Sequence, residues 1–191
     1  MLLLDAKSLG GTDHATPLHA SNDDVAGSGR DGLLPMRLAA CGSDGRRERS
    51  WILLPIAGPS GEAASPSTNG AITTGAVMAL KVIDAGGALS LEPGWVSHNL
   101  AAPATPITVN GVVFTLATGL PATSAGRGTP AVLNAYDGAT GRRLWTSEKA
   151  MTTFASPGSL WTGSGQIYVG AHDGTLYAFG FNDERRSTNG E

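Results

Sequence analysis

The side chains that could carry chemistry are few, and one group of acidic residues lies in a polar segment near the start of the chain. Asp23 and Asp24 follow Asn22, with Asp13 and Asp31 on either side. Calcium takes about six to eight oxygen ligands, many of them carboxylates, so Asp23 and Asp24 are the candidate cation ligands. A solvated acidic loop with no bound ion is the favoured interpretation, so no metal site is predicted.

The histidines and the cysteine give no reactive constellation. His14, His19, His98 and His172 have no metal-ligand spacing. We expect His98 on an exposed connection and His172 in a turn. The single cysteine, Cys41, excludes an internal disulfide and is expected to be a small core residue. No serine stands in a nucleophile-elbow pattern. The sequence therefore predicts no catalytic residue and leaves cofactor binding unassigned.

Composition favours many short strands joined by tight turns. The chain has 191 residues, of which 27 are glycine and 15% are charged, against about 25% charged in typical domains. No segment keeps a helical period. A net charge of −3 without a basic cluster disfavours nucleic-acid binding. No run approaches the ~18 apolar residues of a membrane span. The fold class is predicted to be all-β.

The most informative stretch is 135–145, which reads AYDGATGRRLW. Its pattern, Ala-x-Asp-x-x-Thr-Gly-x-x-x-Trp, fits two strands joined by a tight turn. Asp137 and Thr140 can hydrogen-bond the turn backbone, and Gly141 can take the positive φ that the turn needs. Ala135 lies in the first strand, expected at 132–136. Trp145 is expected to lay its ring against a neighbouring sheet and give its N–H to a buried acceptor.

Parts of this pattern recur along the chain. Segment 165–169 matches 111–115, and 176–179 matches 133–136. Trp95-Val96-Ser97 parallels Trp145-Thr146-Ser147. The pairs Asp44-Gly45, Asn110-Gly111 and Ser164-Gly165 each separate two apolar runs, which is typical of two-residue hairpins. Segments that recur in this way along the chain indicate a stack of similar sheets.

We therefore predict a partial β-propeller over residues 1–181, with about three four-stranded antiparallel blades and long inserted loops. Its parts are a blade remnant at 1–10, blades at 36–97 and 106–147, and an incomplete blade at 157–181. Residues 182–191 are predicted to be a polar disordered tail. Segments 10–34, 58–75 and 117–130 are expected to be surface loops, because they offer little apolar area to bury.

Two interpretations of the incomplete ring stay open. The chain is a truncated piece of a longer propeller, or residues 2–4 fold back beside 175–179 and close a small ring. The four tryptophans, Trp51, Trp95, Trp145 and Trp161, also allow two interpretations. Core packing is favoured over a carbohydrate-stacking platform, because Trp95 and Trp145 occupy equivalent positions in the repeat.

These residues resemble the pyrroloquinoline-quinone-like (PQQ-like) repeat propellers of the quinoprotein alcohol dehydrogenase-like superfamily. Segment 135–145 matches that family's tryptophan-docking motif without a gap, and 165–179 is similar to its central hairpin. Segments 80–116 and 3–11 are similar to bacterial PQQ-binding-like β-propeller repeat proteins. The resemblance implies the C-terminal part of a longer propeller and an exported or periplasmic parent protein, although no signal peptide is recognisable in this chain.

Function is not fixed by the resemblance, because the docking motif is structural in that superfamily. We expect an interaction or scaffold module that binds another protein or an envelope component. The alternative is a fragment of a PQQ-dependent dehydrogenase acting on an alcohol or a sugar. That alternative would place PQQ and Ca²⁺ in a longer parent protein, and no position of this chain matches the family's catalytic Asp.

Overall fold

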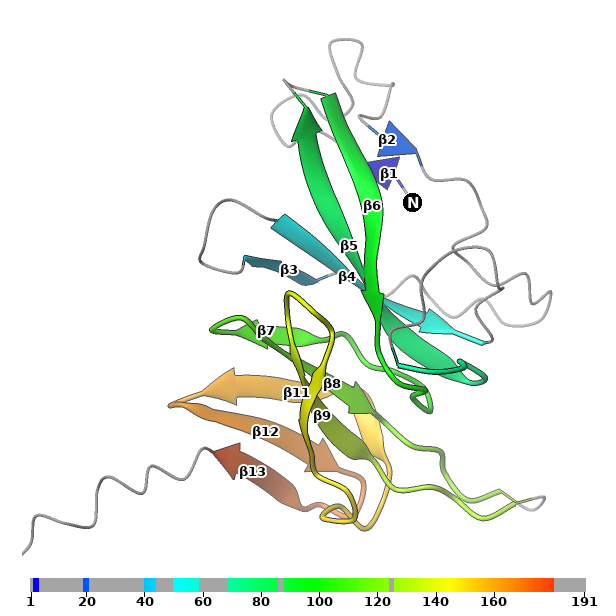
Figure 1. Ribbon diagram of the computed structural model, residues 1–191. Helices are drawn as coiled ribbons and strands as arrows, with labels where there is room; N and C mark the ends of the chain where they lie inside the picture. Colours follow the sequence, from blue (N-terminus) through cyan, green and yellow to red (C-terminus); the bar gives the residue numbers. More distant parts are fainter. Residues whose placement is uncertain are drawn as a thin grey trace, which may run out of the picture.

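A computed structural model describes residues 2–3, 19–20, 40–43, 50–58, 69–85, 88–123 and 126–180. These residues form strands, turns and irregular segments, and none of them lies in a helix. The prediction of an all-β chain is confirmed for the part that is described. Three antiparallel sheets hold most of the strands, and their spatial order follows the order along the chain (Figure 1).

The first sheet contains β3 (Ala40–Ser43), β4 (Ser50–Ala57), β5 (Gly75–Ala85) and β6 (Ala88–Val96). The middle sheet contains β7 (Ile107–Val109), β8 (Val112–Ala117), β9 (Val132–Asp137) and β10 (Arg143–Thr146). The last sheet contains β11 (Ala155–Gly163), β12 (Gln166–Ala171) and β13 (Leu176–Gly180).

Two of the predicted hairpin turns have the backbone that their residues favour. Asn110 and Gly111 join β7 to β8 with φ of 49° and 78°, and Ser164 and Gly165 join β11 to β12 with φ of 51° and 74°. Positive φ at both central residues is the mark of a turn whose twist matches that of the flanking strands. These turns fix the register of the first two strands in the middle and last sheets. The third predicted pair, Asp44-Gly45, lies outside the described residues.

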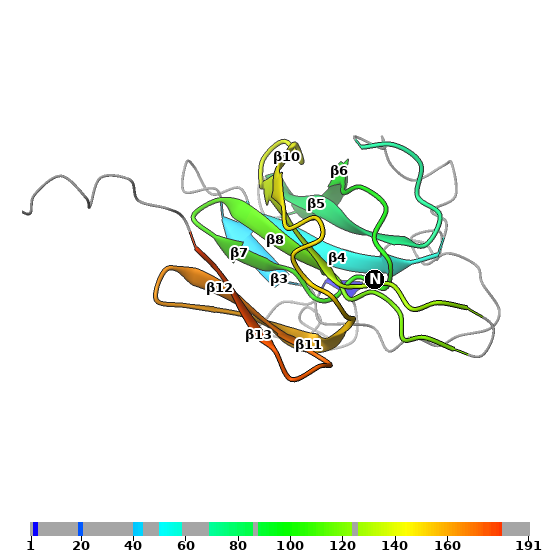
Figure 2. The same ribbon diagram turned by 90° about the horizontal axis from the view of Figure 1, so that it is seen from below.

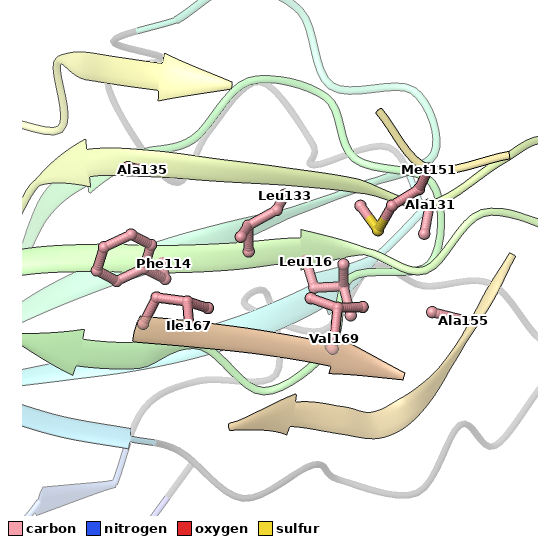
Figure 3. Packing of buried hydrophobic residues seen from close by; sticks show 10 residues of the cluster. Phe114, Leu116, Ala131, Leu133, Ala135, Met151, Ala155, Ile167 and Val169 are labelled. Carbon is pink, nitrogen blue, oxygen red and sulfur yellow. The ribbon is translucent and has the colours of Figure 1, made fainter. Parts of the chain in front are cut away.

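The three sheets pack face to face, with the middle sheet between the other two (Figures 1 and 2). One buried cluster joins the first sheet to the middle sheet and includes Trp51, Leu53, Val77, Trp95, Val113 and Tyr136. A second cluster joins the middle sheet to the last sheet. There, Phe114 and Leu116 on β8 lie close to Ile167 and Val169 on β12 (Figure 3). The middle sheet is thus buried on both faces, and β8 is apolar at every position but Thr115 for that reason.

One of the two interpretations of the incomplete ring is excluded, and one predicted loop contains short pairings. β1 (Leu2–Leu3) does not fold back beside β13, because it pairs with β2 (His19–Ala20). Segment 117–130 is exposed at its described positions from Leu120 on, as predicted for a surface loop, and within it Leu120 pairs with Thr129 and Thr123 with Gly126, so the chain forms a narrow arm. Local propensity alone did not reveal either pairing, since both involve few residues. The predicted tail at 182–191 lies outside the described residues.

Candidate functional site

The turn between β9 and β10 is built by the residues that the sequence motif singled out. Oδ1 of Asp137 accepts hydrogen bonds from the backbone N–H groups of Ala139 (3.2 Å) and Thr140 (2.8 Å), and from the Thr140 hydroxyl (2.7 Å). The Thr140 hydroxyl donates the hydrogen bond that does most to hold the pKa of the Asp137 carboxyl below its ordinary value. Gly141 has φ of 71°, as the turn was predicted to require. These contacts show that Asp137 and Thr140 shape the turn.

Trp95, at the end of β6, lodges its indole against this turn. Its Nε1 donates a 2.8 Å hydrogen bond to the carbonyl oxygen of Gly138, and its ring stacks with Tyr136 at 5.9 Å between centroids. A methyl group on Gly141 would lie 2.5 Å from the Cγ of Trp95, so only glycine leaves room for the indole. Asn69 adds a second bridge, because its side-chain amide donates to the carbonyls of Val96 (2.6 Å) and Gly141 (3.0 Å). The first sheet is thereby joined to the middle sheet by named polar contacts.

The same arrangement of strands is repeated in the first two sheets. Trp95 pairs with Ala79 across the β5–β6 ladder, and Trp145 pairs with Ala135 across the β9–β10 ladder. Each ladder has a register shift next to the tryptophan, which is the geometry of a β-bulge. Ala135 is itself buried between the middle and last sheets. The sequence parallel between the two Trp segments therefore corresponds to a structural parallel.

Two serines that the sequence analysis did not single out extend the parallel. The Ser97 hydroxyl oxygen accepts from the backbone N–H of Val77, and the Ser147 hydroxyl oxygen accepts from the backbone N–H of Leu133, each at 2.9 Å. Both serines are buried. The backbone N–H of Ser97 also donates to the Val77 carbonyl, and the backbone N–H of Ser147 donates to the Leu133 carbonyl. The signal in the sequence was the shared spacing of Trp-x-Ser, which gives each serine a buried backbone group to satisfy.

Trp145 does not have the environment that was predicted. Its side chain is 44% exposed, although its ring meets Phe179 of β13 edge-on at 5.5 Å. Trp161, on β11, is also 44% exposed. Core packing is therefore wrong for these two tryptophans and confirmed for Trp51 and Trp95, which are buried. The indole N–H donor that was predicted at Trp145 is found at Trp95 instead.

His98 is not on an exposed connection, as was expected, but half-buried beside Tyr136. Its backbone N–H donates to the Tyr136 hydroxyl oxygen at 3.3 Å, and its Nδ1 lies 3.4 Å from the same oxygen. Burial lowers the pKa of His98, and the positive charge of Arg143 lowers it further. Burial raises the pKa of the Tyr136 phenol. The pair holds the connection after β6 against the middle sheet.

Ser156 and His172 approach each other as in a catalytic pair, with 3.2 Å between the hydroxyl oxygen and Nε2. The carboxylate next in the chain, Asp173, points elsewhere. Its Oδ1 accepts from the backbone N–H of Thr175 and its Oδ2 from the hydroxyl of Thr152. A hydrolytic triad needs a carboxylate that orients the imidazole, and here that group shapes the β12–β13 turn. His172 therefore has the turn role predicted for it.

The described residues supply no donor set for a cation. They contain no group of three or more His, Cys, Asp and Glu side chains close enough to hold a metal ion. The candidates Asp23 and Asp24 lie outside the described ranges, and the side chain of Cys41 is likewise not described. Among the same residues, no helix has the length and apolar character needed to cross a bilayer.

One face of the last sheet is apolar and open. We call it the outer face and define it by Trp161 on β11, Tyr168 and Gly170 on β12, and Leu176 and Ala178 on β13. Trp161, Tyr168 and Ala178 are direct neighbours across the three strands, and Gly170 pairs with Leu176. Leu176 is 58% exposed, the largest fraction for any big apolar side chain in the described part of the chain.

The middle sheet shows what happens to this face when another sheet lies on it. In the repeat, Tyr168 and Gly170 correspond to Phe114 and Leu116, while Leu176 and Ala178 correspond to Leu133 and Ala135. The ladders agree, because Phe114 pairs with Ala135 as Tyr168 does with Ala178. All four residues of the middle sheet are at most 5% exposed, since the last sheet covers them. The outer face is thus the open counterpart of a buried interface.

Comparisons of the chain with family models, with curated proteins and with solved structures gave no match. The geometry of the sheets and of their faces therefore carries the functional argument.

Proposed function

We propose that the three sheets are consecutive blades of a PQQ-like repeat β-propeller and that the chain acts as an interaction or scaffold module. The observation that carries the interaction role is the outer face, whose counterparts in the middle sheet are buried by protein. Exposed apolar patches on proteins commonly mark sites where another macromolecule binds. The partner is another protein or an envelope component. The family resemblance adds an exported or periplasmic setting to the proposal.

The blade assignment is supported by the way the sheets are joined. The indole of Trp95 meets the turn formed by Asp137, Thr140 and Gly141 of the following sheet, and the residues of that turn match the family's docking motif. Successive four-stranded sheets around an axis are the architecture of propellers. PQQ and Ca²⁺ would belong to a longer parent protein in this proposal, as the family resemblance implies.

Site-specific photocrosslinking tests the interaction role. A benzophenone amino acid replaces Tyr168 on the outer face, and the same group replaces Leu120 on the arm as the control. Leu120 is exposed and Tyr168 is partly exposed, but only Tyr168 lies on the proposed binding face. We expect irradiated cells that express the protein to give adducts of higher mass from position 168 and few from position 120. Equal yields from the two positions, or no protein adduct at 168, would contradict the proposal.

A further inference from the structure

The hydroxyl group of Tyr136 lies where the first sheet meets the middle sheet. Tyr136 is buried, and the connection 97–106 that follows β6 places His98 against it. The Tyr136 oxygen accepts the backbone N–H of His98 at 3.3 Å, so the phenol proton is left to be donated. Nδ1 of His98, at 3.4 Å from the same oxygen, can accept that proton in the neutral imidazole but can only donate in the imidazolium. The direction of this contact therefore depends on the charge of His98.

Thr115, on β8, offers a second acceptor for the same proton. It lies between Val113 and Ala117, and the alternation of side chains along a strand puts all three on the face toward the first sheet. The Thr115 hydroxyl is buried and close enough to lower the pKa of the Tyr136 phenol, yet it makes no hydrogen bond to any residue that the structure describes. A buried hydroxyl without a partner is uncommon and costs free energy, so a proton directed at its oxygen would relieve that cost.

We infer that His98, Tyr136 and Thr115 form a pH-sensitive switch at the joint between the first and middle sheets. While His98 is neutral, the Tyr136 hydroxyl donates to Nδ1. When His98 takes up a proton, the hydroxyl turns to Oγ1 of Thr115, and the Tyr136 oxygen then accepts from Nδ1–H as well as from the backbone N–H. Ser97 lies beside Tyr136 too, but its hydroxyl already donates to the His98 carbonyl and accepts from the N–H of Val77.

The charges around His98 make its protonated form the less stable one. Arg143 on β10 is the charged group among the described residues that shifts the pKa of His98, and it lowers this pKa further than burial alone does. The Asp137 carboxylate is held within its own turn, and Lys81 and Glu92 of the first sheet lie opposite each other further along the β5–β6 ladder. Because the folded-state pKa lies below about 6.5, the switch turns as the pH falls beneath that value, and the folded joint loses stability there.

Imidazole proton NMR of the full chain tests the inference, with Thr115→Val as the main variant. Valine keeps the shape of the side chain but removes the acceptor that the hydroxyl needs when His98 is protonated. The proton affinity of His98 should therefore fall about three- to tenfold, which corresponds to the loss of one buried hydrogen bond. Thr108→Val is the matched control, since the Thr108 hydroxyl on β7 is likewise buried and unbonded among the described residues. The control should leave the titration curve of His98 unchanged.

Two further measurements separate the switch from a general effect on the fold. In a Tyr136→Phe background, Thr115→Val should not change the titration of His98, because no hydroxyl proton is left to redirect. In the wild type, the Thr115 methyl signal should move with the same midpoint as His98, and the Thr108 methyl signal should not. Circular dichroism checks that each variant folds, and the methyl signals decide the matter in the wild type if one does not. An unchanged or raised proton affinity in Thr115→Val, an equal fall in Thr108→Val, or a Thr115 methyl signal that ignores the titration would overturn the inference.

Discussion

The indole nitrogen of Trp95 donates a 2.8 Å hydrogen bond to the carbonyl oxygen of Gly138, 43 positions further along the sequence. This hydrogen bond joins the first sheet to the middle sheet. The bond sits beside the stacked rings of Trp95 and Tyr136, in a buried cluster that both sheets share. Because each partner comes from a different sheet, the contact reports on how the sheets pack and not on the stability of either sheet alone.

Trp95→Phe should lower the free energy of unfolding by about 2–4 kcal/mol. The change leaves the Gly138 carbonyl without its donor, which costs about 1–3 kcal/mol, and it opens a cavity that adds to the loss. Urea denaturation followed by circular dichroism measures the effect. Trp145→Phe is the control and should cost less than about 1 kcal/mol, because that side chain is 44% exposed. Equal losses would show that the Trp95 contact has no special role.

Gly141→Ala should destabilise the protein more than Gly165→Ala. Both glycines have φ above 70°, so both variants carry a similar backbone strain of about 1 kcal/mol. At Gly141 the new methyl group would also lie 2.5 Å from Trp95, whereas nothing lies within 4 Å of it at Gly165. We expect a further loss of about 1–3 kcal/mol for Gly141→Ala from this overlap. Thermal unfolding of the two variants measures both losses of stability, and equal losses would contradict the prediction.

Asp137→Asn should remove part of the acid sensitivity of the fold. The folded-state pKa of the Asp137 carboxyl is lowered, so its contribution is complete above the unfolded value of about 3.9 and is lost as the pH falls through the lower folded value. The stability difference between the wild type and the variant should be constant from pH 7 to about pH 5 and shrink below about pH 4. Urea titrations at each pH measure it. A difference that stays constant down to pH 2 would contradict the assigned shift.

Arg143→Gln should raise the pKa of His98 toward its ordinary value. Burial lowers this pKa most, and the Arg143 charge adds to the effect, so removing the charge relieves only part of the shift. Since the folded-state pKa is lowered, the stability contribution of neutral His98 is present above about pH 6.5 and is lost as the pH falls. Imidazole proton NMR gives the titration curve, with His98→Gln used for assignment. Arg142→Gln should leave the curve unchanged, and an equal rise in that variant would count against the Arg143 assignment.

Much of the sheet architecture could be predicted because turn chemistry is local. Asn110-Gly111 and Ser164-Gly165 mark hairpins by their own backbone preferences, and Asp137, Thr140 and Gly141 define a turn by their spacing alone. The early start of β11 at Ala155 was missed, because Pro157, Gly158 and Ser159 carry no strand-like alternation. The register shift between Ala155 and Leu160 has the same origin.

The environment of the tryptophans could not be predicted, because it depends on what lies beyond each sheet. Trp95 and Trp145 each pair with an alanine, Ala79 and Ala135, and each lies next to a β-bulge. The Trp95 side chain is nevertheless 1% exposed and the Trp145 side chain 44% exposed. Trp95 faces the turn at Gly138 and Gly141, whereas Trp145 meets only the edge of Phe179. Equivalent positions in the repeat therefore have different burial. The outer face was missed for the same reason, since Leu176 resembles the buried Leu133 in every local respect.

The arm at 117–130 can change in length without changing how the sheets pack. The paired positions toward its tip, Leu120 with Thr129 and Thr123 with Gly126, belong to neither of the clusters between the sheets. Doubling the length of such a segment costs only about 0.6 kcal/mol in closure entropy. Foreign peptides grafted beyond Thr123 can therefore be displayed by this protein while β8 and β9 keep their register, which makes the arm a natural place for variation and for engineering.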